Sequence, residues 1–238
     1  MQHDETVYRP DELRLARSPA HHFRDGELCE RILDKLGKCL SEYCTRNPDA
    51  GDYDFGSTPT LFSGTVTPGG KQRQLLGLPN KNGNYYVFDR AQVDAGPVAT
   101  IRLASANRTD PTKGNGSIAP SAFDGRTLYV AGGGTEIKGL HVPGSVSAFD
   151  PNNLSTPIWQ FAAAGPVLGA ISTAPGLVVI GNGPFTTLLS SVDGTPLFQA
   201  PVSNPRAAVI FGAATIAGGR VYQGDTSGRL YAYGLHGR

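Results

Sequence analysis

The chain has 238 residues and a mass of 25.0 kDa, which is enough for one substantial core or two small ones. Hydrophobic residues make up 39% of it, which excludes a disordered chain, and a net charge of +1 leaves no basic footprint for nucleic acid. No apolar run approaches the roughly 20 residues of a membrane span, and the polar start of the chain has no apolar segment typical of a signal peptide.

Residues 1–50 differ in composition from the rest of the chain, because they contain only two glycines, Gly26 and Gly37. The stretch from Asp25 to Tyr43 predicts an amphipathic helix, with Asp25 as its N-cap. The apolar residues at helical spacing are Leu28, Ile32, Leu33, Leu36 and Leu40. A single helix cannot bury such a stripe alone, so we expect residues 1–50 to form a helical, cysteine-containing extension or insertion that packs on the remainder.

The three cysteines, Cys29, Cys39 and Cys44, all lie in this first part. They form no C-x-x-C pair, which argues against zinc. Two interpretations stay open at this point. Cys39 and Cys44 form a disulfide if the helix ends near Tyr43, or the cysteines are free thiols in a packed segment.

Residues 51–238 hold nearly all of the 31 glycines and repeat a pattern of short β-rich runs. Each repeat has a small-residue run, a second β-rich run and a closing run followed by a turn residue. The small-residue runs are 57–62, 118–123, 169–174 and 211–216, the second runs are 74–78, 128–131, 177–180 and 220–223, and the closing runs are 85–89, 145–150, 190–193 and 229–234. Three to four strands in ~40–45 residues is the period of a propeller blade. The sequence therefore predicts an all-β fold, a partial β-propeller of about four blades over residues 51–238 after the short N-terminal helical segment.

This arrangement predicts the positions of several individual residues. Trp159 and Phe198 fall on the outer strands of their blades, where they cover the core between blades. Asp150 and Asp193 follow closing strands, so we expect them to form turns and not to catalyse. The Gly-rich stretches 107–116 and 132–144 accommodate the extra length of the second repeat.

Two segments of residues 51–90 resemble a known family. They are Asp52-Tyr53-Asp54-Phe55-Gly56-Ser57-Thr58-Pro59 and Leu75-Leu76-Gly77-Leu78-Pro79-Asn80-Lys81-Asn82-Gly83-Asn84-Tyr85-Tyr86-Val87-Phe88-Asp89-Arg90. They are similar to the pyrroloquinoline-quinone (PQQ) dependent quinoprotein alcohol dehydrogenases, in particular to the polyvinyl-alcohol-dehydrogenase-like branch. That family is an eight-bladed propeller with its cofactor over the central channel, so the resemblance covers a C-terminal half.

The resemblance implies a role for two residues. By position, Asp54 is the catalytic base and also a ligand of the calcium ion, and Lys81 hydrogen-bonds the carbonyl oxygens of PQQ. A carboxylate can accept the alcohol proton while hydride passes to the quinone, and a lysine ammonium stabilises the charge that develops on its oxygen. The structural interpretation stays open as well: Asp54 caps a strand, and Lys81-Asn82-Gly83 is a hairpin turn in its own right.

The chain also departs from the family pattern. The blades that supply most calcium ligands and a stacking tryptophan are absent, the family's later tryptophan falls near Val167 or Leu168, and an asparagine expected near Ser117 is displaced, with Asn115 nearby. Two functions therefore stand. One is an alcohol dehydrogenase that acts on an alcohol, polymeric in the branch named, passes electrons to an acceptor such as a cytochrome c, and works in the periplasm or outside the cell. The other is a non-catalytic propeller scaffold for protein–protein interaction. In either case a partner chain or a dimer could complete the ring.

Overall fold

The computed structural model describes residues 53, 55–106 and 115–234, together with the backbone of strands at 23–24, 27–33 and 39–46. Four antiparallel sheets follow one another along residues 60–234 of this described part. Sheet I consists of β4 (Thr60–Gly64), β5 (Arg73–Pro79), β6 (Asn84–Asp89) and β7 (Ala99–Arg102). Sheet II consists of β8 (Ala122–Phe123), β9 (Leu128–Gly132), β12 (Gly144–Phe149) and β13 (Trp159–Ala163). Sheet III consists of β14 (Ser172–Ala174), β15 (Leu177–Asn182), β16 (Phe185–Ser190) and β17 (Pro196–Pro201), and sheet IV of β18 (Thr215–Ala217), β19 (Arg220–Gly224) and β20 (Leu230–Gly234).

Strand order within each sheet follows the chain, as expected for blades built from consecutive hairpins. Sheet II alone is interrupted, by a separate hairpin of β10 (Thr135–Ile137) and β11 (Leu140–Val142) between β9 and β12. This hairpin lies within the Gly-rich stretch 132–144, so the prediction that this stretch absorbs extra length is confirmed.

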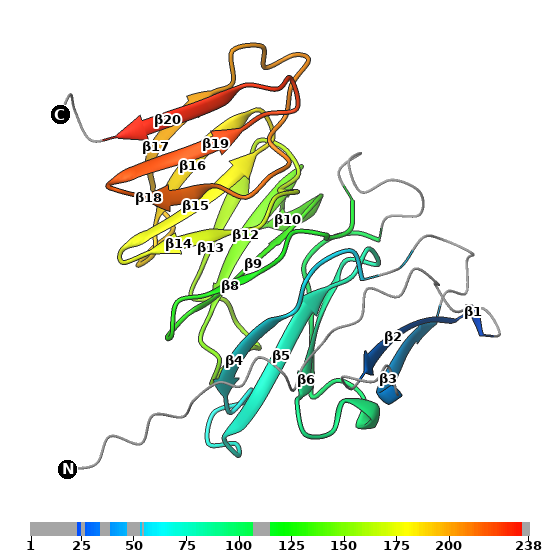
Figure 1. Ribbon diagram of the computed structural model, residues 1–238. Helices are drawn as coiled ribbons and strands as arrows, with labels where there is room; N and C mark the ends of the chain where they lie inside the picture. Colours follow the sequence, from blue (N-terminus) through cyan, green and yellow to red (C-terminus); the bar gives the residue numbers. More distant parts are fainter. Residues whose placement is uncertain are drawn as a thin grey trace.

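The four sheets follow one another face to face (Figure 1). Buried apolar side chains fill the space between neighbouring sheets. Leu75, Tyr85 and Val87 of sheet I meet Leu128 and Val130 of sheet II. A second cluster, between sheets II and III, contains Tyr129, Val146, Trp159, Val178, Ile180 and Leu189. A third cluster packs sheet IV against sheet III, and it contains Val179, Ala214 and Val221. The sheets do not close on themselves within the described residues, which gives the partial, all-β propeller that the repeats predict.

The predicted N-terminal helix is wrong. The segment forms strands β1 (Phe23–Arg24), β2 (Glu27–Leu33) and β3 (Cys39–Arg46) in a sheet of their own. Gly37 is unfavourable in a helix interior, and the run from Cys39 to Arg46 contains the strand-forming residues Tyr43 and Thr45. The same apolar residues that suggest a helix are too few to exclude a hairpin.

This hairpin also excludes the Cys39–Cys44 disulfide. Both residues lie on β3, and five residues of extended chain separate their Cα atoms by roughly 16 Å, far beyond the reach of a disulfide. The register of β2 and β3 places Cys44 opposite Cys29.

One predicted strand of the propeller is displaced. The closing strand of the third repeat, expected at 190–193, is β16 (Phe185–Ser190), and Val192, Asp193 and Gly194 belong to the turn that follows. Gly194 has a φ of 72°, which favours glycine, so the chain reverses there. Trp159 and Phe198 lie on β13 and β17, the outer strands, as predicted. None of the helical turns in the described residues is long and apolar enough to cross a membrane.

Candidate functional site

The turn that carries Lys81 joins β5 to β6 and is organised by Asn80, whose side chain is fully buried. The Asn80 Nδ2 group donates to the carbonyl oxygen of Tyr53 at 2.8 Å, and its Oδ1 atom accepts from the Asn82 N–H at 2.8 Å. The Asn80 N–H donates to the Asn84 carbonyl, and the Gly83 N–H donates to the Asn80 carbonyl, both at 2.9 Å. The turn therefore has a fixed shape with Lys81 in its first half.

Gly83 is the one position in this turn where glycine is required. Its φ is 86°, and a Cβ atom there would lie 2.1 Å from the carbonyl oxygen of Ala104. The close approach lets the Gly83 carbonyl accept from the N–H groups of Leu103 and Ala104 at 2.8 and 3.0 Å. The turn is thereby tied to the chain that leaves sheet I.

A second cation lies beside the turn. The Arg102 guanidinium, on β7, donates to the Asn82 carbonyl at 2.9 Å and to Asn84 Oδ1 at 3.2 Å. Asn82 Nδ2 in turn donates to the Tyr86 hydroxyl at 2.8 Å. The sequence alone does not point to Arg102, because an exposed arginine on a strand carries no local motif. Only the pairing of Asn84 with Arg102 across β6 and β7 reveals it.

Described residues on either side of position 54 contact this turn. Asp54 itself lies outside the described residues, so its role stays a prediction. Tyr53, just before it, accepts the hydrogen bond from Asn80, and the Phe55 ring, just after it, meets the Tyr86 ring edge to face at 5.6 Å. A Cβ atom on Gly56 would lie 3.8 Å from Lys81 Cε and 3.1 Å from Ile118 Cγ2. Both flanks of position 54 are thus held against the turn of Lys81.

One buried polar atom in this region has no partner within the described part of the chain. It is Ser57 Oγ, which makes no hydrogen bond there. The hydroxyl of Ser117, one residue before Ile118, instead donates to the Ala131 carbonyl. A buried hydroxyl without a partner is unfavourable, which makes Ser57 a candidate contact for a bound group beside Gly56.

The other positions that the resemblance singles out do not add to this site. Val167 and Leu168 are 2% and 7% exposed and belong to the buried side chains of the core. Trp159 packs on Tyr129 at 5.8 Å and donates through Nε1 to the Ser191 carbonyl at 3.1 Å. The described residues contain no group of three or more His, Cys, Asp or Glu side chains that could hold a metal ion.

The two aspartates expected in turns do form turns. Asp150 Oδ1 accepts from the Asn152 N–H at 2.9 Å. Asp193 Oδ1 accepts from the Thr195 hydroxyl at 2.8 Å and from its N–H at 3.1 Å. These two bonds hold the pKa of Asp193 below its ordinary value, and the bond from the Thr195 hydroxyl has the larger effect.

Comparison with solved structures places the fold among β-propellers. The chain is similar to BamB from Moraxella catarrhalis, with a TM-score of 0.54 and 16% identity over 88% of this chain and 52% of that chain. It is also similar to the quinohemoprotein alcohol dehydrogenase from Comamonas testosteroni, with a TM-score of 0.59 and 16% identity over 83% of this chain and 38% of that one. A europium-containing methanol dehydrogenase gives a TM-score of 0.57 and 18% identity over 83% and 44%.

Sequence identities of 16–18% show a similar fold, and they do not show a shared function. The chain spans between about two-fifths and one half of the length of these three proteins. No protein-family model matches the sequence, and no curated protein matches it.

Proposed function

We propose that the chain forms part of a PQQ-dependent alcohol dehydrogenase, with the quinone at the Asn80–Asn84 turn. The observation that carries this proposal is the attachment of both flanks of position 54 to the turn of Lys81, through Asn80 on one side and Gly56 on the other. The similar folds of a quinohemoprotein alcohol dehydrogenase and a methanol dehydrogenase support it. Because the chain covers less than half of those two proteins, the remaining blades of a complete enzyme are part of the proposal.

The residues present fit the quinone better than the calcium ion. The Ser57 hydroxyl is buried without a partner among the described residues, and Gly56 next to it lies close to Lys81 Cε. Calcium takes six to eight oxygen ligands, and no metal-binding cluster occurs within the described ranges. Asp54 would therefore be one ligand of several, with the others supplied from outside this part of the chain.

The chain's own residues would divide the work as follows. Bound PQQ supplies an electrophilic carbonyl that accepts hydride. Asp54 would take the hydroxyl proton of the alcohol. Lys81 would donate a hydrogen bond to the quinone oxygens and stabilise the negative charge that develops there. Arg102, fixed to the turn by Asn82 and Asn84, adds positive charge beside Lys81.

An activity assay tests this proposal. The purified chain is supplied with PQQ, calcium ions, a secondary alcohol or polyvinyl alcohol, and an artificial electron acceptor whose reduction is followed by absorbance. We expect Asp54→Asn and Lys81→Met each to lower the rate by about 100-fold or more, as for the loss of a proton acceptor or a charge-stabilising donor. Lys138→Met, at the exposed β10–β11 turn, is the matched control and should leave the rate unchanged. If the wild-type chain neither reduces the acceptor with any alcohol nor binds PQQ, the proposal does not hold for this chain.

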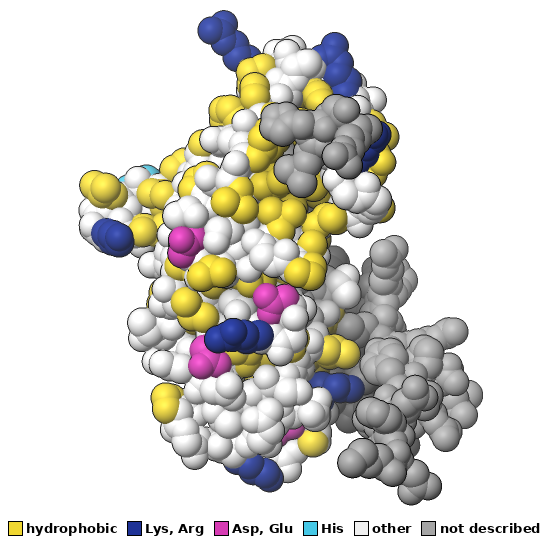
Figure 2. Space-filling view, turned by 90° about the vertical axis from the view of Figure 1, so that its left-hand side faces the viewer, with side chains coloured by type: hydrophobic (Ala, Val, Ile, Leu, Met, Phe, Trp, Pro, Cys, Tyr) yellow, Lys and Arg dark blue, Asp and Glu magenta, His cyan; other side chains and the backbone are white. Residues whose placement is uncertain are grey.

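A second function is a propeller scaffold for another protein chain. It is favoured by the edge strand and the exposed apolar side chains of sheet IV. This sheet has three described strands where the others have four, so β20 is an edge strand. Leu230 on β20 is 74% exposed, and Phe211 and Val209 before β18 are 47% and 38% exposed. Hydrophobic side chains gather over the upper half of the face in Figure 2, where sheets III and IV lie. Such a surface suits a partner chain or a second copy that continues the ring.

For either function we propose a periplasmic or secreted location, which follows from the resemblance to quinoprotein dehydrogenases. For the enzyme we further propose a polymeric or secondary alcohol as substrate and a cytochrome c as electron acceptor. Capture of a partner protein by a chain with no affinity for PQQ would favour the scaffold over the enzyme.

A further inference from the structure

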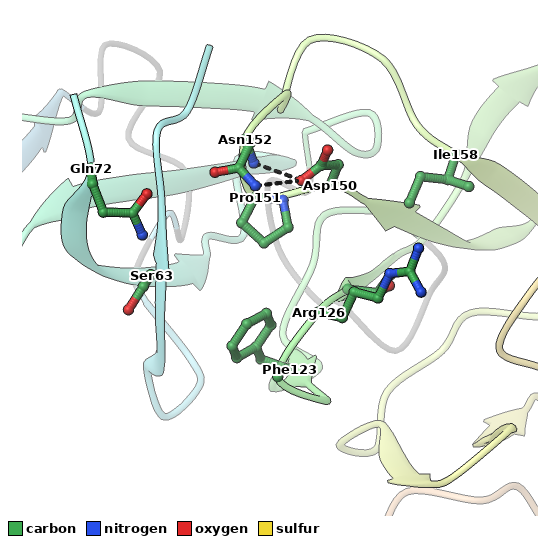
Figure 3. A pocket seen from close by; sticks show the side chains of 10 residues that line it. Ser63, Gln72, Phe123, Arg126, Asp150, Pro151, Asn152 and Ile158 are labelled. Atoms are coloured by element: carbon green, nitrogen blue, oxygen red, sulfur yellow. Dashed lines mark hydrogen bonds between the residues drawn. The ribbon is translucent and has the colours of Figure 1, made fainter. Parts of the chain in front are cut away.

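A groove of about 540 Å³ opens between sheets I and II, away from the turn of Lys81 (Figure 3). Its walls come from the β4–β5 connection, from the turn between β8 and β9, and from the chain that joins β12 to β13. β5 runs from the groove end at Arg73 to Pro79 beside the turn, and its seven residues span roughly 20 Å. The groove is therefore separate from the proposed quinone site.

The two walls are locked together by backbone contacts. The Val66 N–H donates to the Pro151 carbonyl, and the Leu154 N–H donates to the Val66 carbonyl, both at 2.9 Å. Val66 is buried and has a φ of 68°. This left-handed conformation is unfavourable for a β-branched residue, so the surrounding contacts must stabilise it. A Cβ atom on Gly64 would lie 2.4 Å from the Pro151 carbonyl oxygen, so the walls cannot come closer. The groove is preformed and not produced by loose packing.

Polar side chains from three segments face this groove with hydrogen-bonding capacity to spare. Asp150 uses Oδ1 to accept from the N–H and Nδ2 of Asn152, at 2.9 and 3.1 Å, whereas its Oδ2 atom has no partner among the described residues. The Arg126 guanidinium and the Gln72 amide likewise make no hydrogen bond within the described part of the chain. One acidic and one basic side chain leave the lining without net charge.

Three apolar side chains, Phe123, Pro151 and Ile158, complete the lining. Figure 3 shows Gln72 and Ser63 on the sheet I side, Arg126 and Ile158 on the sheet II side, and Phe123 and Pro151 between them. Ile158 is 56% exposed, so apolar surface is available to a ligand. Most of the lining is polar and the groove is open to solvent, so a ligand here would be held mainly by hydrogen bonds.

We propose that this groove binds a polyhydroxylated chain. Carboxylate, amide and guanidinium groups each present paired donors or acceptors, which suit neighbouring hydroxyl groups, and the ring of Phe123 suits the C–H faces of such a molecule. A cationic ligand would be repelled by Arg126 and an anionic ligand by Asp150. The shared chemistry fits an oligosaccharide, with vicinal hydroxyls, and a vinyl-alcohol oligomer, with hydroxyls on alternate carbons. The vinyl-alcohol oligomer as ligand rests on the proposed dehydrogenase function, whereas binding of an oligosaccharide does not.

Isothermal titration calorimetry of the full chain, without PQQ, tests this site with three probes: cellotriose, a short vinyl-alcohol oligomer and succinate. We expect saturable binding of one or both hydroxylated probes, and the tighter one identifies the source. Arg126→Gln, Asp150→Asn and Gln72→Ala should each weaken that binding at least fivefold. Arg206→Gln and Asp94→Asn, exposed and distant along the chain, are the charge-matched controls and should stay within twofold.

Each variant is compared only if the fluorescence of Trp159, the single tryptophan, matches that of the wild type, which keeps a folding defect from counting as lost binding. Three outcomes would overturn the proposal: no saturable heat with either hydroxylated probe, unchanged affinity in all three groove variants, or tighter binding of succinate. Because PQQ is absent, failure here leaves the dehydrogenase assay unaffected.

Discussion

Tyr85 shows how single polar atoms fix the packing of sheet I on sheet II. Its side chain is fully buried, and its hydroxyl lies 2.6 Å from Ser121 Oγ. The Ser121 hydroxyl donates to Thr60 Oγ1 at 2.7 Å, and the Thr60 hydroxyl donates to the Ser121 carbonyl at 2.8 Å. Burial, the largest influence, raises the pKa of Tyr85, so the neutral phenol is the form that the core stabilises.

Tyr85→Phe should therefore lower the free energy of unfolding by about 1 kcal/mol, the net contribution of a typical buried hydrogen bond. Urea denaturation followed by Trp159 fluorescence measures the change. Tyr222→Phe, on β19, is the matched control and should stay within about 0.5 kcal/mol of the wild type. Equal stability of Tyr85→Phe and wild type would show that the hydroxyl chain contributes nothing.

Asp225 predicts a specific response to acid. Its Oδ1 atom accepts from the Ser227 hydroxyl at 2.7 Å and its Oδ2 atom from the Tyr231 hydroxyl at 2.7 Å. These bonds, the Ser227 bond above all, lower its pKa from 3.8 to about 2. A depressed folded pKa stabilises the fold above the ordinary value, and this contribution is lost as the pH falls through the folded value.

Wild type should accordingly lose stability between about pH 4 and pH 2 more steeply than Asp225→Asn, which has no carboxyl group to protonate. Thermal melts across this range measure the difference, with Asp94→Asn as an exposed control. Parallel curves for wild type and Asp225→Asn would contradict the assigned bonds.

At the level of strands, the sequence predicts the propeller well because each blade repeats the same local pattern. The second runs of all four repeats coincide with β5, β9, β15 and β19. The errors occur where local pattern is ambiguous. Val192-Asp193 imitates a closing strand but lies in a turn, and the apolar residues between Leu28 and Leu40 suit a helix as well as a hairpin.

The candidate site was predictable only in part, for a related reason. Lys81 follows from a contiguous motif and its role stays a prediction, and the described contact is that of its Cε atom with the Gly56 position. Strand pairing brings Arg102 to the turn of Lys81, and the packing of sheet I on sheet II brings Gln72 to Arg126 and Asp150 in the groove. A single sequence without three-dimensional contacts cannot reveal such sites.

Gly77 on β5 tests the packing of the first sheet. A Cβ atom there would lie 2.5 Å from the Tyr85 hydroxyl and 2.6 Å from its Cε1 atom, and the buried ring has no room to move. We expect Gly77→Ala to lower the free energy of unfolding by roughly 1–3 kcal/mol, the usual cost of overpacking a core. Gly212→Ala, where no atom lies within 4 Å of the added Cβ, is the control for glycine replacement itself. Urea denaturation in which Gly77→Ala is as stable as Gly212→Ala would rule out this packing.

Across the whole molecule, the exposed face of sheet IV should control association. If a second copy continues the ring, light scattering after size exclusion should give a mass near twice 25.0 kDa. Leu230→Asp should restore the monomer, since Leu230 is 74% exposed on the edge strand. Leu140→Asp, at a residue 70% exposed on the separate hairpin, should leave the mass unchanged. A wild-type monomer at all concentrations would exclude self-association.

Equilibrium dialysis of PQQ against the purified chain tests most directly whether the Asn80–Asn84 turn binds a quinone. We predict saturable binding by wild type, binding at least tenfold weaker for Lys81→Met, partial recovery with Lys81→Arg, and unchanged binding for Lys138→Met. The absence of saturable PQQ binding by wild type, or equal binding by Lys81→Met, would contradict it.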